Sequence, residues 1–160
     1  MRTVGIAAAL SLVAASAACG YSATAGTSRL PPGSERVHVP SFANRTADAE
    51  AGALVASALR EELARRGAGG GEGAPARIEG AVTRVSAAPL TTQGGTWRLV
   101  FEVQATLVVD GKDAAAASVR REVDYLGEVD AIATEGRRRL ALRKAAGEAA
   151  LEIVERFEAP

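Results

Sequence analysis

The chain has 160 residues, with 19 Lys and Arg against 19 Asp and Glu, so its formal net charge at pH 7 is zero. This balance argues against nucleic acid as a partner and against purely electrostatic binding to an anionic bilayer. Removal of residues 1–18 would leave about 140 residues with a net charge of −1, which is one domain of ordinary size.

The beginning of the chain has the pattern of a lipoprotein signal peptide. A short positive start precedes an apolar run over residues 4–18 that is too short for a stable membrane span. Cys19 follows small residues, which resembles the lipobox of bacterial lipoproteins, although Ser16 stands where that motif usually has Leu. In that class the peptide is removed and the cysteine is acylated, so we expect cleavage after residue 18 and a lipid anchor on Cys19. The alternative is an ordinary secreted protein cut after Ala17, with Cys19 left as a free thiol.

Residues 19–35 are rich in Gly, Ser, Thr and Pro and are expected to tether the lipid to the fold. Gly20 stands in the second position of the processed chain, where the sorting rule of enterobacterial lipoproteins then favours the outer membrane. No cysteine follows Cys19, so we expect no internal disulfide and no cysteine-based metal site. We also expect no cofactor. Stability must therefore come from an apolar core.

A single α+β domain is expected over residues 36–160, and it begins with a strand over 37–42. Val37 and Val39 lie on one face of this strand. Pro40 cannot donate a hydrogen bond to a ladder, so it ends the strand or places it at a sheet edge.

The next element is a helix predicted over residues 47–66. Thr46 or Asp48 is its expected N-cap, and Gly67 is its expected stop. Glu62 falls within the buried stripe of this helix, and the pattern gives no reason for a carboxylate there. The other members of the stripe are Leu54, Val55, Ala58, Leu59 and Leu63.

Three strands are predicted next, over residues 77–87, 96–109 and 114–125. The first alternates loosely, and its phase slips near Val85, whereas the second is the clearest alternating pattern in the chain. Asp110-Gly111 directly follows it and is a strong two-residue hairpin signal of type I′. Every second residue of the central strand is apolar: Trp97, Leu99, Phe101, Val103, Ala105, Leu107 and Val109.

A long helix is predicted over residues 130–158, which gives the order β-α-β-β-β-α. Two helices packed on one face of a mostly antiparallel four-stranded sheet would bury every apolar stripe. The crossover helix allows the first two strands to be parallel neighbours. The expected apolar face of the last helix consists of Leu140, Leu142, Ala146, Ala150, Leu151, Ile153, Val154 and Phe157.

The residues needed for a known catalytic or metal-binding motif are missing. His38 is the only histidine, and it lies on a predicted strand with no Cys, Asp or Glu at ligand spacing. The patterns of serine hydrolases, zinc proteases and phosphate-binding loops do not occur. We therefore expect a binding protein and not an enzyme.

The most unusual charge feature is a cluster of five cations near the start of the last helix. It is either a solvated helix face, with Glu135 and Glu148 as ion-pair partners, or a patch that binds phosphate or carboxylate groups. A second candidate is Arg120 with Arg121 on the returning strand. The cations of the main cluster are Arg137, Arg138, Arg139, Arg143 and Lys144.

Taken together, several segments resemble the LptE family, outer-membrane lipoproteins that assist lipopolysaccharide assembly. They are Cys19-Gly20-Tyr21, Leu30-Pro31, residues 39–46, and the order of the helices and strands that follow. The resemblance implies an outer-membrane lipoprotein on the periplasmic face that plugs and supports a large β-barrel partner and contacts lipopolysaccharide. We expect that contact at Arg137, Arg138 and Lys144, with Arg120 and Arg121 as the second choice. These five positions come from local charge and not from the family.

Residues 39–46 and the following helix are also similar to a different class of lipoproteins. That class includes activators of peptidoglycan synthases and curli-type secretion channels. The chain is short and lacks further strands or helices for a channel wall, which argues against a pore. An envelope lipoprotein that activates a peptidoglycan synthase, or binds another envelope complex, therefore stays open as the alternative.

Overall fold

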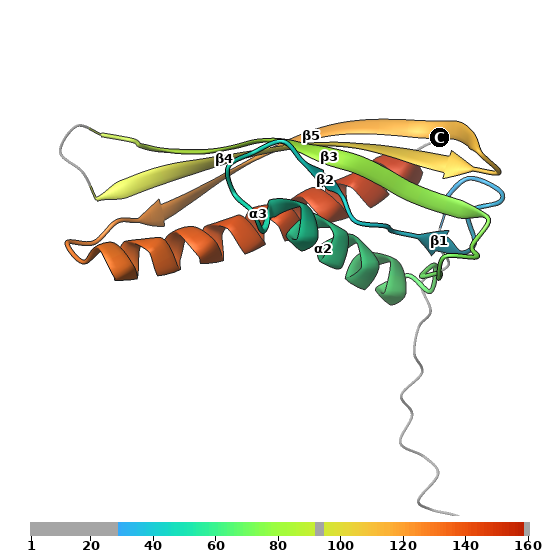
Figure 1. Cartoon of the computed structure of the whole chain (residues 1–160), viewed down its shortest axis with the longest axis horizontal. Helices are drawn as coiled ribbons and strands as arrows, with labels where there is room; N and C mark the ends of the chain where they lie inside the picture. The colour runs from blue at the N-terminus through green and yellow to red at the C-terminus, as the bar shows by residue number, and fades with distance from the viewer. Residues whose placement is uncertain (1–28, 92–94, 159–160) are drawn as a thin grey trace, which may run out of the picture.

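The computed structural model describes residues 29–91 and 95–158, so the expected signal peptide, Cys19 and most of the tether lie outside the described residues. Figure 1 shows two helices on one face of a single sheet, as expected from the sequence. The predicted α+β order is confirmed. In chain order the elements are β1 (Val37–His38), β2 (Ala43–Asn44), α2 (Ala51–Arg65), β3 (Ala76–Pro89), β4 (Thr96–Val109), β5 (Lys112–Leu126) and α3 (Ala131–Glu158).

The sheet is mixed, and two short strands fill its first position in place of one. The order is β1-β3-β4-β5, and β2 also pairs with β3; β1 and β2 run parallel to β3, and the other pairs are antiparallel. The single strand expected over residues 37–42 is therefore wrong. Pro40 lacks the N–H of a ladder residue, and the chain leaves the sheet between β1 and β2. Val39 stays buried, and its carbonyl accepts a hydrogen bond from Arg60 Nε at 3.0 Å.

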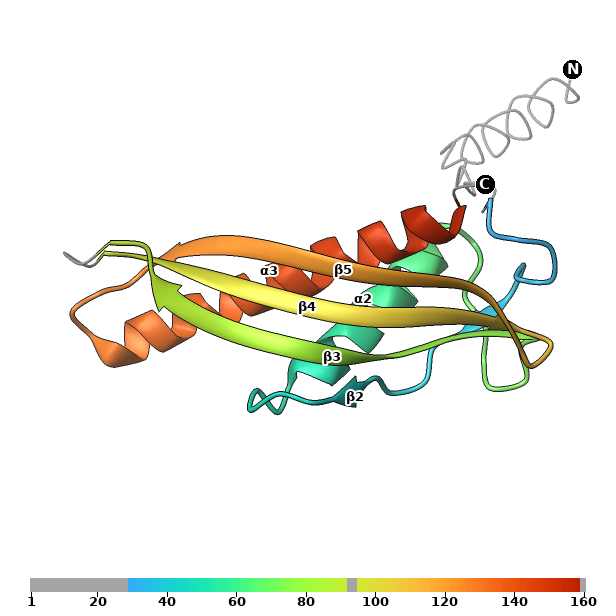
Figure 2. The ribbon, with the colours of Figure 1, turned by 90° about the horizontal axis from the view of Figure 1, so that it is seen from above.

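The three long strands form the centre of the fold (Figure 2). The turn between β4 and β5 has φ of 50° at Asp110 and 77° at Gly111, which confirms the expected positive φ at both positions. The predicted phase slip in β3 is an irregular step between Val82 and Arg84, one residue before Val85. The inner face of β4 is fully buried from Leu99 to Leu107 at every second residue.

Helix α2 begins at Ala51, four residues later than expected, and no side chain caps it. The reason is a turn held by Asn44. Its Oδ1 accepts hydrogen bonds from the N–H and hydroxyl of Thr46, at 3.0 and 2.8 Å, and its Nδ2 donates to the carbonyl of Asp48 at 2.6 Å. The expected stop is confirmed, since Gly67 has φ of 72° just after the helix.

Helix α3 packs through small residues, and this corrects the expected apolar face at two positions. Leu140 and Leu151 are 63% and 39% exposed. Both lie to one side of an alanine-rich stripe, which lets the helix approach the sheet and α2 closely. Within the described residues, no helix has both the length and the apolar character needed to cross a membrane. The buried residues are Ala141, Leu142, Ala145, Ala146, Ala149, Ala150, Ile153, Val154 and Phe157.

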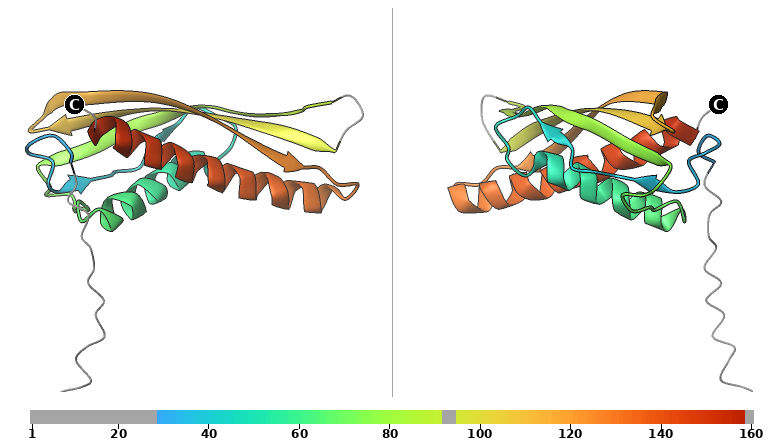
Figure 3. Two further views of the ribbon diagram at one scale, coloured as in Figure 1. Left: turned by 180° about the vertical axis from the view of Figure 1, so that it is seen from behind. Right: turned by 45° about the vertical axis from the view of Figure 1, so that its right-hand side comes forward.

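The two helices cover the sheet unequally, as the views in Figure 3 show. Helix α3 runs along the whole length of the sheet, whereas α2 covers only the half that contains β1. At that end the backbone N–H of Arg29 donates to Glu158 at 3.4 Å, so the described chain begins beside the end of α3. The opposite end holds the β5–α3 turn, where Val129 and Ile132 are exposed.

Candidate functional site

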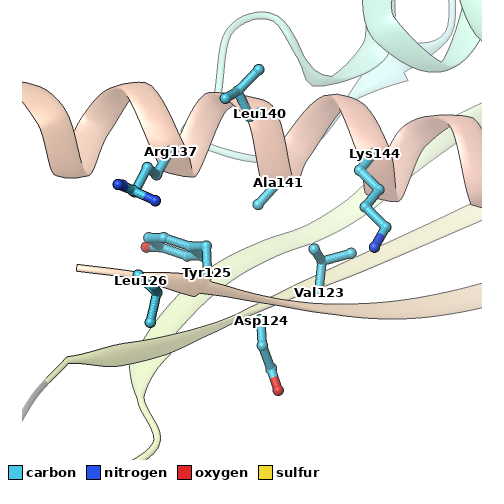
Figure 4. A pocket seen from close by; sticks show the side chains of 8 residues that line it. All are labelled: Val123, Asp124, Tyr125, Leu126, Arg137, Leu140, Ala141 and Lys144. Atoms are coloured by element: carbon cyan, nitrogen blue, oxygen red, sulfur yellow. The ribbon is translucent and has the colours of Figure 1, made fainter.

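A groove lies between the end of β5 and the first half of α3, in the part of the sheet that α2 does not cover. Its volume is about 350 Å³. Leu126 and Leu140, at its margin, are 55% and 63% exposed. In Figure 4 their side chains point away from the space between β5 and α3, on opposite sides of it. The lining residues, shown in Figure 4, are Val123, Asp124, Tyr125, Leu126, Arg137, Leu140, Ala141 and Lys144.

Two cations stand on the helix side of this groove. Arg137 and Lys144 are two turns apart on α3, so their Cα atoms are separated by about 10 Å along the axis, with Leu140 between them (Figure 4). Arg137 forms an ion pair with Glu128, and Lys144 Nζ lies 3.8 Å from Glu148. Both cations are about half exposed or more, and such pairs contribute about 1 kcal/mol or less. An anionic ligand can therefore replace these partners at little cost.

The carboxylate of Asp124 does not oppose these cations inside the groove. It points to the outer face of the sheet (Figure 4) and accepts two hydrogen bonds from Arg98, at 2.8 and 3.0 Å. These bonds lower the pKa of Asp124 below its ordinary value. The acid thus stays charged and is neutralised by a neighbour on β4.

Arg138 differs from its neighbours because it is partly buried, at 27% exposure, and all three of its guanidinium nitrogens are engaged. Its Nη1 lies 2.5 Å from Asp48, and its Nε donates to Glu135 at 2.8 Å. These contacts raise the pKa of Arg138, and its hydrogen bond, followed by that of Arg139, lowers the pKa of Glu135. Arg138 therefore ties α3 to the turn before α2, and it is not the freely exposed cation that the charge pattern suggested.

The second expected pair, Arg120 and Arg121, lies away from the groove lining. Arg120 is on the outer face of β5, where it pairs with Glu102 at 2.9 Å and Glu122 at 2.7 Å. Arg121 faces α3 and pairs with Glu152 at 2.5 Å. The structure thus brings together Arg137 and Lys144 of the five expected residues and separates the other three from the groove.

Sequence reasoning missed the β5 side of the groove. Trp97 and Tyr125 stack with ring centroids 6.4 Å apart, at the end of the β4–β5 ladder. Burial raises the pKa of Tyr125 above its ordinary value of 10.0. The alternation of β5 identified Tyr125 as inward-facing, but nothing in the sequence indicated that the inner face is only partly covered at this end.

The role of Glu62 is now explained by an ion-pair network at the other end of the molecule. Glu62 is 4% exposed, and its Oε1 lies 2.6 Å from Arg66 Nε, while Arg65 pairs with its second oxygen. Arg66 also forms an ion pair with Glu158. Burial alone would lower the pKa of Arg66, but hydrogen bonds to Glu158 and Glu62 raise it. The network joins the last turns of both helices.

His38 is half-buried on β1. Among residues 29–91 and 95–158, no group of three or more His, Cys, Asp or Glu side chains is arranged to hold a metal ion. The groove itself presents apolar Val123 and Ala141, the ring of Tyr125, and two exposed cations, Arg137 and Lys144.

Comparison with known proteins identifies a family. The model of the LptE family, described as lipopolysaccharide-assembly, matches residues 34–157. A comparison with curated proteins gives no match.

Solved structures with similar folds include two lipoproteins and PelC. A candidate lipoprotein from Caulobacter crescentus is 18% identical, with a TM-score of 0.60 over 79% of this chain and 90% of that one. PelC from Paraburkholderia phytofirmans, solved as a dodecamer, is 20% identical, with a TM-score of 0.56 over 80% and 91%. Rare lipoprotein B from Shewanella oneidensis is 19% identical, with a TM-score of 0.51 over 74% and 92%. At these identities the likeness establishes the fold.

Proposed function

Because the chain belongs to the LptE family of lipopolysaccharide-assembly proteins, we propose that it works at the outer membrane, supporting a large β-barrel translocon and contacting lipopolysaccharide. The proposed anchor is an acylated Cys19, which places the domain on the periplasmic face. The observation that carries the lipid contact is the groove, because it combines exposed apolar side chains with exposed cations.

Lipopolysaccharide has the two chemical parts that such a groove can bind. Its acyl chains are apolar and suit Val123, Ala141 and the ring of Tyr125 between strand and helix, and its phosphate groups suit Arg137 and Lys144. A side chain of Arg binds phosphate through two parallel hydrogen bonds, whereas Lys acts as a point charge. The spacing of two turns allows the two cations to bind separate phosphates, or one phosphate and one carboxylate, of a single amphiphile.

Removal of the two groove cations tests this contact. We expect Arg137→Ser with Lys144→Ser to weaken binding to lipopolysaccharide micelles about tenfold or more, since each cation near an anionic surface contributes about 1 kcal/mol. Binding can be followed by the fluorescence of Trp97, the only tryptophan, which stacks on a groove residue. The effect should shrink as the salt concentration rises.

A matched control removes two positive charges elsewhere. Arg36 and Lys112 are exposed, form no described ion pair and do not line the groove. Arg36→Ser with Lys112→Ser should change binding by less than twofold. Equal losses in both double variants would indicate a general charge effect and would remove the groove from the mechanism, but would leave support of the barrel standing.

Co-purification with a β-barrel protein tests the proposed support of a translocon. We expect a large outer-membrane β-barrel protein to co-purify one to one in detergent, and to be depleted from outer membranes when this lipoprotein is absent. Recovery of no barrel, combined with stimulation of a peptidoglycan synthase, would replace the proposal with the alternative drawn from the sequence.

A further inference from the structure

Helix α3 presents a stripe to solvent that the fold leaves without a partner. We call it the α3 stripe: Gly136, Leu140, Lys144, Gly147 and Leu151, at steps of four, four, three and four residues. The view from behind in Figure 3 shows α3 along the outside of the molecule, and all five residues of the stripe are exposed. Leu140 and Leu151 are exposed, although both have the character of buried residues.

Two glycines within this stripe allow another backbone to come close. Glycine lowers helix stability relative to other residues, so its presence in the middle of an exposed helix has a cost. A Cβ at Gly136 or Gly147 would meet nothing within 4 Å, so the fold of this chain does not require either glycine. Both therefore leave room beside the exposed leucines.

The charges on α3 separate into two halves of opposite sign. Residues 131–144 contain five cations and one acid, a net charge of +4, whereas residues 145–158 contain one cation and four acids, a net charge of −3. An antiparallel neighbour with the same sequence would place each half against its opposite. A parallel neighbour would place like charges together.

We propose that, when no amphiphile occupies the groove, a second copy of this chain binds antiparallel along the α3 stripe, because Arg137, Leu140 and Lys144 cannot serve both contacts at once. One register satisfies the apolar and the charged residues together. Leu140 packs on Leu151 of the second copy, Lys144 lies beside its Glu148, and Arg137 lies beside its Glu155. The residue numbers of each pair add to 291 or 292, and a nearly constant sum means that one antiparallel register contains all three contacts. Glu155 is exposed and has no ion pair among the described residues, so it is available for this contact.

The same register predicts that the association is weak and depends on salt. Four apolar side chains and four ion pairs form a smaller interface than the roughly 800 Å² per partner of a typical stable complex. Exposed ion pairs are also screened by salt. Two copies held on one membrane would have a high effective concentration, which favours such a contact without further area.

Cysteine cross-linking tests the register directly. The full chain with Cys19→Ser is purified in a non-ionic detergent at low salt, so that an added cysteine is the only thiol. We expect a mixture of the Leu140→Cys and Leu151→Cys chains to form a disulfide-linked dimer at least fivefold faster than either chain alone. A parallel pair would instead link each variant to itself. Links within each variant, or no link above the background of a Lys112→Cys control, would overturn the proposal.

Charge reversal adds an independent rescue test. Arg137→Glu with Lys144→Glu should abolish self-association measured by sedimentation velocity, and mixing that chain with Glu148→Lys/Glu155→Lys should restore it. All four positions are at least partly exposed, so circular dichroism melts should stay close to that of the parent chain. Failure of the mixed chains to associate, with both folds intact, would also contradict the proposed register.

Discussion

At the scale of single residues, buried charges join elements that are distant in the sequence. Glu62 is almost fully buried within the apolar face of α2, and Arg66 connects it to Glu158 at the end of α3. Arg138 makes the same kind of link at the other end of α2 through Asp48. A buried ion pair is costly to break from one side, because the remaining charge loses its partner.

Arg66→Met should therefore lower the free energy of unfolding by about 2–3 kcal/mol, because it leaves the Glu62 carboxylate buried with only the exposed Arg65 beside it. The double variant Glu62→Leu/Arg66→Met should recover most of this loss, since no buried charge remains. Urea unfolding of both proteins measures the difference. A double variant as unstable as the single one would mean that the loss comes from packing of the Arg66 side chain.

The interactions of Glu135 predict an acid-sensitive contribution to stability. Hydrogen bonds from Arg138, and then from Arg139, lower its pKa below the ordinary value of 4.5. A carboxyl group with a lowered pKa in the folded state stabilises the fold fully above its ordinary pKa, and this contribution disappears as the pH falls through the lower value. The urea midpoint should thus fall more steeply below pH 4.5 for the parent chain than for Arg138→Gln. Parallel pH profiles would contradict this interpretation.

At the scale of elements, each helix or strand was predicted as accurately as its sequence pattern was regular. The strict alternation of β4 predicted both of its ends, and the positive φ at Asp110 and Gly111 is what their hairpin signal requires. The start of α2 was predicted wrongly because the side chain of Asn44 holds a turn where Thr46 and Asp48 had been expected to cap a helix.

The groove could not be predicted from local pattern. The groove forms because α2 is shorter than the sheet. It also forms because alanines of α3 face the core, whereas Leu140 and Leu151 do not. On a helical wheel, Leu140 and Leu151 lie next to the buried alanines. The wheel does not show how the helix is rotated about its axis against the sheet, so it cannot tell which of these residues face the core. Arg137 and Lys144 were found by charge alone, whereas their apolar neighbours on β5 carried no signal.

The same change to alanine at Gly80 and at Gly111 compares a glycine required by close packing with a glycine required by a turn. A Cβ at Gly80 would lie 2.0 Å from the Gln104 carbonyl oxygen and 2.8 Å from the Phe42 ring, so Gly80→Ala should destabilise by about 3 kcal/mol. Gly111 has φ of 77° and nothing within 4 Å, so Gly111→Ala should cost only about 1 kcal/mol. Thermal melts of the two variants measure which loses more stability. A larger loss at Gly111 would mean that β3 and β4 can separate locally without strain.

At the scale of the whole molecule, the ends of the domain have different roles. The described chain begins at Arg29, beside the ends of both helices and the Glu62 network. Helix α3 leads from there over about 40 Å to the end with Val129 and Ile132. Arg29 follows Cys19 by ten positions, so a lipid on that cysteine would hold this end within about 35 Å of the bilayer. The groove and the exposed β5–α3 turn would then lie on the far half of the domain.

The anchor itself gives the last prediction. Replacing residues 1–18 with a cleavable secretory signal and changing Cys19→Ser should move the protein from the outer membrane to the soluble periplasmic fraction. The physical reason is that the acyl chains proposed for Cys19 would supply the membrane attachment, and the serine variant cannot carry them. The melting temperature should not change, because residue 19 precedes the matched domain that starts at residue 34. Fractionation should be done in cells depleted of the proposed barrel, which would otherwise retain the protein. A serine variant that still sediments with outer membranes in those cells, even after a high-salt wash, would show that a surface of the folded domain binds the membrane.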